Sequence, residues 1–185
     1  MLEGLFKEIE KEMESAIKSV KKEMDSIRTG RASASLVEDL KVDYYGAPTL
    51  LKQLASISVP DASTILIQPW DRASLKAIEK AILLSPLKLM PMNDGKVLRI
   101  TLPPLTEERR QELVKLVKKK AEDGKVHVRN IRREANEKLK EMKENGDISE
   151  DDYYKYLKKV QELTDKYVGK VDEILEEKEK EIEED

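Results

Sequence analysis

Three stretches of this chain repeat apolar residues at steps of three and four, the spacing that places side chains on one face of an α-helix. In the first stretch these residues are Leu2, Phe6, Ile9, Met13, Ala16, Val20, Met24 and Ile27. In the second stretch they are Leu113, Val117, Ala121, Gly124, Val128, Ile131, Ala135, Leu139 and Met142. In the third stretch they are Tyr153, Leu157, Val160, Leu163, Tyr167, Val171, Ile174, Lys178 and Ile182. Because no such helix can bury its stripe alone, the pattern predicts a long antiparallel three-helix bundle made of residues 1–29 and 106–185.

The ends of the second and third helices carry local signals. Thr106 is followed by acidic residues, as expected for an N-cap and a first helical turn. Asn145 and Gly146 supply a left-handed stop, and Ser149 with Asp152 forms a capping box for the next helix. A homo-oligomeric coiled coil is the alternative reading. Three stripes on one chain with one short connection favour an intramolecular bundle, and hence a monomer.

Between the first two helices the pattern changes. All seven prolines lie from Pro48 to Pro104, and proline in a helix interior costs about 3 kcal/mol. The simplest arrangement is a separate domain, residues 31–104, inserted into the bundle. The two crossings, near 29–31 and 103–105, are then candidate hinges.

Within the inserted domain, apolar residues alternate at 40–44, 55–59, 65–67 and 98–102, which is typical of strands. Turns are expected at Gly46-Ala47-Pro48 and at Asn93-Asp94-Gly95. Asp71 can cap a helix whose apolar face holds Leu75, Ile78 and Ile82. The fold class predicted is therefore α+β, with a small β/α/β domain in the bundle. Trp70, the only tryptophan, is expected to pack in the core.

Composition narrows the possible chemistry. The chain has no cysteine and one histidine, which excludes disulfides, thiolate catalysis and zinc sites of the Cys/His type. No run of apolar residues is long enough to span a membrane, and the N-terminus does not read as a secretion signal, so a cytoplasmic location is expected. Neither a phosphate-binding loop nor an acid/base constellation is recognisable. We therefore expect a protein that is not an enzyme, with no cofactor, no metal and no small-molecule substrate.

Charge is distributed unevenly between the second and third helices. Residues 106–145 carry 13 basic and 9 acidic side chains, whereas residues 146–185 carry 7 and 15. An anionic partner is best sought on the basic helix. The two helices could equally complement each other, and charge totals alone leave both explanations open.

One edge of the basic helix concentrates cations. At roughly 100° per residue, Lys118, Lys125, Arg129, Arg132 and Asn136 fall in a narrow sector beside the apolar stripe, and Arg133 lies just outside it. We expect no acid in that sector beside Arg129 and Arg132. Guanidinium groups bind phosphates in a bidentate manner and stack on bases, so this edge favours binding of structured RNA. The alternative is an exposed face on which arginine and glutamate alternate.

Glycine at position 124 interrupts the stripe of the longest helix. Because glycine costs about 1 kcal/mol against alanine in a helix, we expect Gly124 to allow a close approach between two helices.

Several sequence blocks together resemble the bacterial ribosome recycling factors over the length of the chain. They are Arg28–Ser33, Val42–Gly46, Pro69–Asp71, Ile78–Ile82, Asn93–Gly95, Leu105–Arg110, Val128–Arg133 and Thr164–Asp165. The departures are small: Ala34 stands where the family often has proline, and Lys88 where it frequently has glycine.

The resemblance implies an L-shaped two-domain protein that binds the post-termination ribosome between the subunits. With elongation factor G and its GTP hydrolysis, it would separate the subunits for reuse. The implied ribosomal-RNA contacts are Arg129, Arg132, Arg133, Arg110 and Arg31, with Arg28 and Asn130 as weaker members and Lys125 and Lys118 as flanking cations. The implied hinge residues are Thr29, Gly30, Arg31, Pro103, Pro104 and Leu105, and elongation factor G would act on the inserted domain.

Two other classes remain open on the residues alone. A coiled-coil chaperone or scaffold would expose an apolar groove and bind with weak salt dependence, whereas RNA binding weakens steeply with salt. A nucleic-acid-processing enzyme is disfavoured because no acid/base or metal constellation is recognisable.

Overall fold

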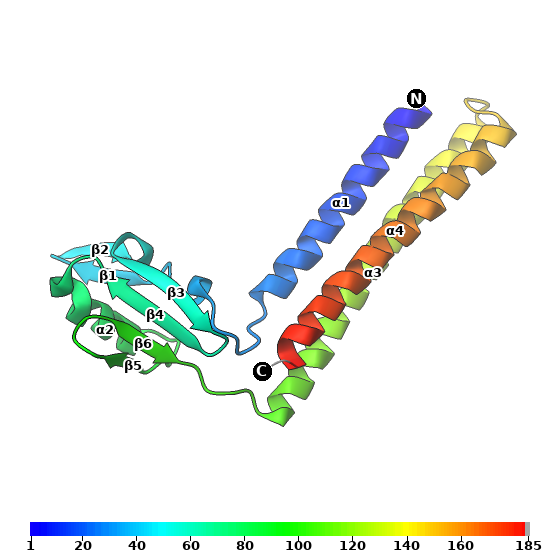
Figure 1. The fold of residues 1–185 in the computed structure, drawn as a ribbon. Coiled ribbons are helices and arrows are strands. Elements are labelled where there is room, and N and C mark those ends of the chain that lie inside the picture. The colour runs from blue at the N-terminus through cyan, green and yellow to red at the C-terminus, as the bar shows by residue number, and fades with distance from the viewer. Residues whose placement is uncertain (184–185) are drawn as a thin grey trace. The chain divides into compact units, whose positions relative to one another are not determined.

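A computed structural model describes residues 1–183 of the chain, and these separate into two units (Figure 1). The helical unit holds Met1–Arg28 and the chain from Glu107 onward, and the inserted unit holds Thr29–Thr106. Within the described residues, no helix combines the length and the apolar character that crossing a bilayer requires.

The helical unit contains α1 (Leu2–Ser26), α3 (Glu107–Glu144) and α4 (Glu150–Glu183), with α3 running opposite to the other two (Figure 1). The predicted apolar stripes form its core. On α3 every stripe position from Leu113 to Leu139 is buried. On α1 the buried residues are Ile9, Met13, Ala16, Val20 and Met24, and on α4 they include Val160, Leu163, Tyr167, Val171 and Ile182. The bundle predicted from the period of the sequence is therefore confirmed.

The connection between α3 and α4 also follows its local signals. Gly146 has φ +75°, and its N–H and that of Asp147 donate to carbonyl groups of the last turn of α3. The Ser149 hydroxyl accepts from the Asp152 N–H at 3.0 Å, which confirms the capping interaction at the start of α4. A tight reversal of this kind keeps α3 and α4 paired along their length.

Gly124 marks a close approach of α1 and α3. A Cβ atom at this position would overlap the Val20 side chain of α1. The expectation that this glycine permits close helix packing is confirmed, since any larger residue must displace Val20.

The inserted unit is built from two antiparallel sheets and one helix. A two-stranded sheet pairs β1 (Lys41–Tyr44) with β2 (Ala47–Leu50). A four-stranded sheet has the order β3-β4-β6-β5. Its strands are β3 (Ala55–Asp61), β4 (Thr64–Pro69), β5 (Pro91–Asn93) and β6 (Leu98–Thr101), and the helix is α2 (Leu75–Leu84). Short 3₁₀ turns cover Ala34–Leu36, Leu51–Gln53 and Arg72–Ser74. The α+β fold class is therefore confirmed.

Apolar residues from the strands and α2 meet in one core that is separate from that of the bundle. Its fully buried members include Val42, Ile65, Ile67, Ile78, Ile82, Leu98 and Ile100. These are the alternating positions that the sequence assigned to strands and to one helix face, so the core follows from the period of two in the strands and the stripe on α2.

Two strands were not predicted from the sequence, because each contains a proline. Pro48 lies in β2, where only a turn was expected, and Pro91 begins β5. Both are edge strands. On the open side of an edge strand no N–H is needed for pairing, so proline, which lacks one, is tolerated there. Lys88, in the loop before β5, has φ +55°, a left-handed conformation that explains why glycine suits this position.

Trp70 does not pack in the core, so the prediction for it is wrong: the residue is 68 % exposed. In β4 the inward positions are Ile65, Ile67 and Pro69, and all three are buried. Because alternate residues of a strand point to opposite faces, Trp70 points outward. The strand register therefore overrides the general preference of tryptophan for burial.

The turn and capping residues of the inserted unit do match their signals. The Asp71 carboxylate accepts from the Ala73 N–H at 3.0 Å and receives the Tyr44 hydroxyl at 3.1 Å, a bond that raises the pKa of Tyr44. In the turn between β5 and β6, the Asp94 carboxylate accepts the N–H groups of Val97 and Lys96, which lowers the pKa of Asp94. These bonds fix the ends of α2 and β6 locally.

Candidate nucleic-acid interface

Helix α3 carries most of the predicted RNA-contacting residues. Because its apolar stripe is buried against α1 and α4, its rotation is fixed and its cationic edge lies beside the stripe, where Lys125, Arg129 and Arg132 are half-buried. Of the candidates, Arg110, Lys118, Lys125, Arg129, Asn130, Arg132 and Arg133 lie on α3. Arg28 and Arg31 lie instead on the segment that follows α1, and both are exposed. A rod of 38 residues, about 57 Å long, thus presents the cations in fixed order.

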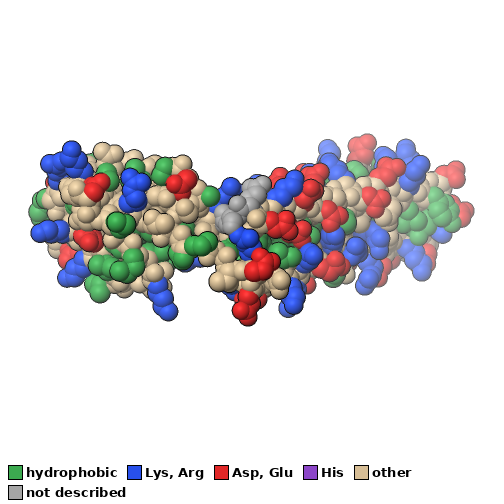
Figure 2. All heavy atoms as spheres, turned by 60° about the horizontal axis from the view of Figure 1, so that its bottom comes forward, with side chains coloured by type: hydrophobic (Ala, Val, Ile, Leu, Met, Phe, Trp, Pro, Cys, Tyr) green, Lys and Arg blue, Asp and Glu red, His purple; other side chains and the backbone are tan. Residues whose placement is uncertain are grey.

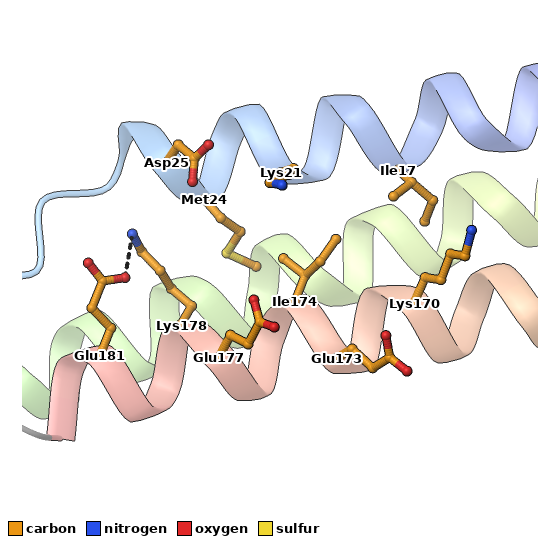
Figure 3. Close-up of a pocket in the computed structure, with 10 residues that line it drawn as sticks. All are labelled: Ile17, Lys21, Met24, Asp25, Lys170, Glu173, Ile174, Glu177, Lys178 and Glu181. Carbon is orange, nitrogen blue, oxygen red and sulfur yellow. Dashed lines mark ion pairs between the residues drawn. The ribbon is translucent and has the colours of Figure 1, made fainter. Parts of the chain in front are cut away.

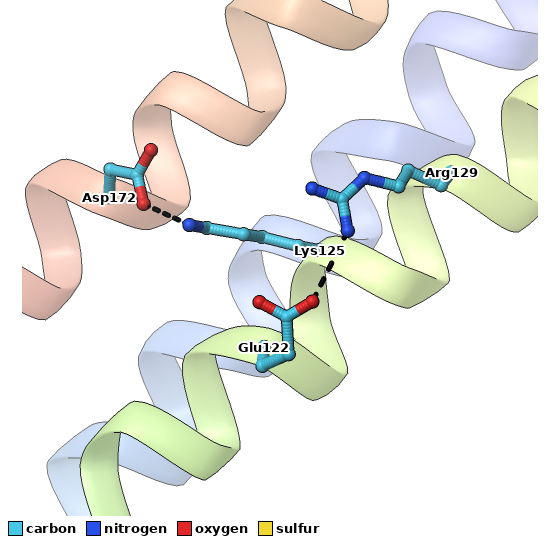
Figure 4. A network of polar contacts seen from close by, with 4 residues as sticks. All are labelled: Glu122, Lys125, Arg129 and Asp172. Carbon is cyan, nitrogen blue, oxygen red and sulfur yellow. Dashed lines mark hydrogen bonds and ion pairs between the residues drawn. The ribbon is translucent and has the colours of Figure 1, made fainter.

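Acids do occupy this edge, contrary to the expectation from the helical sector. Arg129 pairs with Glu122 of the same helix at 3.2 Å, and Lys125 pairs with Asp172 of α4 (Figure 4). Glu122 lies in the same sector as Arg129 on a helical projection, and Asp172 arrives from the neighbouring helix. Two of the candidate cations are therefore held by carboxylates.

Arg132 is held differently. Its guanidinium donates to the Gln161 side-chain oxygen of α4 at 3.3 Å, and the Gln161 amide nitrogen donates to Asp165 at 2.9 Å. An amide oxygen orients a guanidinium without neutralising it. Among residues 1–183, Arg133 makes no ion pair and is exposed. Among the described residues of this edge, the cations that no carboxylate pairs are therefore Arg132 and Lys118, with Arg133 just outside it.

Arg110 lies further toward the start of α3. It is only loosely paired with Glu107, at 3.9 Å, and its buried Nε has no hydrogen-bond partner. It lines a pocket of about 550 Å³ together with Glu107, Gln111, Val114, Lys115, Lys118 and Glu183. The buried Nε is thus unsatisfied in this structure, and the part of the Arg110 side chain that an RNA could reach is its exposed quarter.

A second pocket lies between α1 and α4 and has a different character (Figure 3). Its volume is about 360 Å³, and it is lined by Ile17, Lys21, Met24, Asp25, Lys170, Glu173, Ile174, Glu177, Lys178 and Glu181. Lys178 occupies a stripe position, is buried, and pairs with Glu181 at 3.3 Å. Lysines alternate with carboxylates around the apolar floor, so the lining has no net preference for an anion. No group of residues within 1–183 has the spacing of a metal site.

The two segments that join the units are anchored at one turn of the inserted unit. The Ala32 N–H donates to the Ala62 carbonyl at 2.7 Å, and the Leu102 N–H donates to the Ser63 carbonyl at 2.7 Å. Both acceptors lie in the turn between β3 and β4. These bonds tie Ala32 and Leu102 to the inserted unit.

Gly30 and Leu105 meet between those anchors and the helices. Gly30 has φ +80°, and a Cβ there would lie 2.7 Å from Leu105 Cγ. Thr29 is buried beside them, although its neighbours in sequence are not. Glycine is thus required at position 30 both by backbone conformation and by the contact with the second joining segment.

The inserted unit presents a different kind of surface. Large apolar side chains are exposed on it, among them Tyr45 (80 %), Leu84 (76 %), Met90 (74 %) and Met92 (68 %). Figure 2 shows hydrophobic side chains among charged ones at the surface of this unit, and lysines, arginines and acids interleaved over the helices. These side chains are candidates for contact with another protein.

The sequence did not single out the α4 side of the interface. Asp172 follows Val171 of the buried stripe, and Gln161 follows Val160, so both lie beside the seam. Placement next to a buried position is the signal that could have found them. Asp165, the partner of Gln161, does belong to one of the blocks that carried the family resemblance.

Comparisons with known proteins agree with that resemblance. A family model described as "Ribosome recycling factor" matches residues 20–182. The ribosome-recycling factor of Oleidesulfovibrio alaskensis is 54 % identical over 181 residues, covering 98 % of both chains. That of Geobacillus kaustophilus is 53 % identical over 182 residues, again covering 98 % of both.

Solved structures give the same result for the fold. A solution structure of a ribosome recycling factor matches 100 % of this chain and 98 % of its own, with 49 % identity and a TM-score of 0.74. A second match, with 44 % identity, a TM-score of 0.64 and 98 % coverage of both chains, belongs to a set of structural models. They describe the T. thermophilus ribosome recycling factor and E. coli elongation factor G bound to the E. coli post-termination complex.

Proposed function

This chain belongs to the ribosome recycling factor family, and from that premise we propose that it acts on the post-termination ribosome. It binds between the subunits and, with elongation factor G and its GTP hydrolysis, separates them for reuse. It is a translation factor and not an enzyme, because the GTPase in this reaction is elongation factor G. We place it in the cytoplasm, acting as a monomer.

The observation that carries the proposal is the family membership together with the cationic edge of α3. A relative that is 44 % identical over nearly the whole chain has been described on the post-termination complex with elongation factor G. Ribosomal RNA is the densest source of phosphate there, and a stiff helix edge lined with arginine suits phosphate contacts and the shape of folded RNA.

The proposed RNA contacts are those assigned from the sequence, and they are ordered here by whether a carboxylate pairs with each cation. Arg132 and Arg133 rank first because, within the described residues, they are the candidate arginines of α3 that no carboxylate pairs. Arg110 follows because its pair with Glu107 is long, at 3.9 Å, and Arg129 must leave Glu122 to contribute fully. The remaining members of the set are Arg31, Arg28, Asn130, Lys125 and Lys118.

The proposed hinge consists of Thr29, Gly30, Arg31, Pro103, Pro104 and Leu105. The anchoring bonds of Ala32 and Leu102 support this assignment, because they tie the chain on either side to the inserted unit. Prolines at 103 and 104 restrict the path of the second segment. The exposed apolar side chains of the inserted unit are the surface on which elongation factor G acts.

Co-sedimentation with purified large ribosomal subunits across a salt series tests the proposal. The logarithm of the association constant should fall linearly with the logarithm of the salt concentration, and the slope should correspond to several phosphate contacts. Subunit splitting should then require both elongation factor G and GTP. Binding that ignores salt, or capture of unfolded protein clients in preference to ribosomes, would contradict the proposal and favour the chaperone class.

A further inference from the structure

The basic helix α3 and the acidic helix α4 are packed side by side, and two polar contacts between them differ in kind. One is an ion pair, Lys125 with Asp172. The other is a hydrogen bond from the charged Arg132 guanidinium to the neutral Gln161 side chain, at 3.3 Å. The two contacts have opposite effects on the availability of two candidate RNA-binding cations, and α4 supplies both partners.

Asp172 removes Lys125 from the outward surface. The Lys125 side chain extends from α3 to the carboxylate on α4 (Figure 4), and only 18 % of it is exposed, against 54 % for Asp172. A phosphate approaching this site meets the carboxylate before the ammonium. At 4 Å in water, two unit charges of the same sign repel by about 1 kcal/mol. Asp172 therefore competes with a phosphate for Lys125 and repels it.

Gln161 has the reverse effect on Arg132. Its oxygen accepts one guanidinium N–H, and its amide nitrogen is held by Asp165 at 2.9 Å, which fixes which end of the amide faces the arginine. The contact uses one edge of the guanidinium and leaves the other donors for a ligand. Because the partner is neutral, the full positive charge remains.

We propose that residues of α4 determine which cations of α3 can bind RNA. Asp172 keeps Lys125 from RNA (the withholding role), and Gln161, oriented by Asp165, holds Arg132 in position for RNA (the presenting role). This proposal rests on the proposed function, since it concerns the same surface. Its consequence is selectivity. An extended RNA, which gains from every free cation, is bound less well, while a folded RNA that fits the oriented arginine is bound fully.

Removing the charge at position 172 tests the withholding role. Asp172→Asn should bind both large subunits and polyuridylate about fivefold more tightly, with a log salt slope steeper by about one unit. In a Lys125→Ala background the gain should be smaller and the salt slope should no longer steepen, because only the repulsion by Asp172 is left to remove. The matched control is Glu173→Gln, which removes the same charge from the adjacent residue, whose side chain lines the pocket toward α1 (Figure 3).

Removing the amide at position 161 tests the presenting role. Gln161→Ala should weaken large-subunit binding about fivefold with no change in salt slope, because the charge of Arg132 is retained. Polyuridylate binding should be unaffected. In an Arg132→Ala background, Gln161→Ala should have no further effect, a non-additivity that a merely structural role would not produce.

The outcomes separate this inference from the proposed function. If wild-type protein fails to bind large subunits, or Arg132→Ala binds as wild type does, the proposed site is wrong. If Arg132 matters but Asp172→Asn binds no more tightly than Glu173→Gln, the withholding role is overturned. If Gln161→Ala remains additive with Arg132→Ala, the presenting role is overturned.

Discussion

The helical unit and the inserted unit offer a partner two different surfaces. The exposed surface of the helices is charged, and its specificity depends on which cations are paired, as with Lys125 and Arg132. The inserted unit exposes Trp70, Leu84 and Met90, which carry no charge. A surface of the first kind suits phosphates, and one of the second kind suits a protein. The comparison supports the proposal that one chain divides its contacts with RNA and with protein between two separately folded units.

The largest expected effect concerns the packing of the helical unit. Gly124→Leu should lower the free energy of unfolding by about 3 kcal/mol, because even a Cβ at this position overlaps Val20. Thermal unfolding followed by far-UV circular dichroism measures it. Gly169→Leu on α4 is the control, since nothing lies within 4 Å of a Cβ there. Equal stability of the two variants would show that the helices can separate at Gly124 without cost.

Arg132→Ala tests the charged surface alone. It should weaken binding to large subunits by about 2 kcal/mol, or about thirtyfold, and make the salt slope shallower by about one unit. Folding should change by less than about 1 kcal/mol, because the apolar stripe is untouched. Arg132→Lys should restore part of the loss, since it keeps the charge without the planar fork. Wild-type affinity with an unchanged slope would exclude Arg132 from the interface.

Gly30→Ala tests the connection between the two surfaces. The left-handed backbone should cost about 1–2 kcal/mol in unfolding free energy, and the overlap with Leu105 should add to it. Splitting by elongation factor G should slow, while salt-dependent binding to large subunits persists. Gly46→Ala is the matched control for backbone strain, because its φ is +82° and nothing lies within 4 Å of its Cβ position. A normal splitting rate for Gly30→Ala would remove this residue from the hinge.

Alkaline pH should weaken the helical unit through Tyr167. Burial, together with the Glu14 carboxylate that accepts its hydroxyl at 3.2 Å, raises the pKa of Tyr167 to about 12 from 10.0. As pH rises, Tyr167 therefore ionises in the unfolded chain before it ionises in the folded one. The free energy of unfolding is unaffected below pH 10 and falls between pH 10 and pH 12, by up to about 1.4 kcal/mol per pH unit. Urea unfolding across this range measures the slope. Tyr167→Phe should flatten it, and an unchanged slope would assign the loss to other groups.

The smallest expected effect concerns the apolar surface. Replacing Met90 and Met92 by serine should leave folding within about 0.5 kcal/mol and large-subunit binding unchanged, because both side chains are exposed. Splitting with elongation factor G should require about fivefold more of that factor, on the order of 1 kcal/mol. Leu116→Ser, at an exposed apolar position on α3, is the control. If the control slows splitting as much, the inserted unit has no special part in that contact.

Much of the fold could be predicted from the sequence because its signals are local. The stripe from Leu113 to Leu139 has a helical period, and burial follows from that period alone. Ser149 caps α4 through an N–H three residues away. Such features depend on near neighbours in sequence, so the pattern predicts them directly.

The inserted unit was harder to predict from the sequence, because strand pairing decided its details. The short strands β2 and β5 contain prolines and exist because β1 and β6 offer them a partner. Trp70 is exposed because the register of β4 puts Pro69 inside. Propensity favours neither outcome, and both depend on how the strands pair.

The amino-acid sequence by itself determined that α3 carries the cations and that its stripe fixes which edge faces outward. What only the tertiary structure decided is which of those cations are free. Asp172 and Gln161 reach the edge from a helix that folds back along α3, at positions no helical projection of α3 contains. Charge on a helix is a property of its own residues, whereas the availability of that charge depends on the neighbour packed beside it.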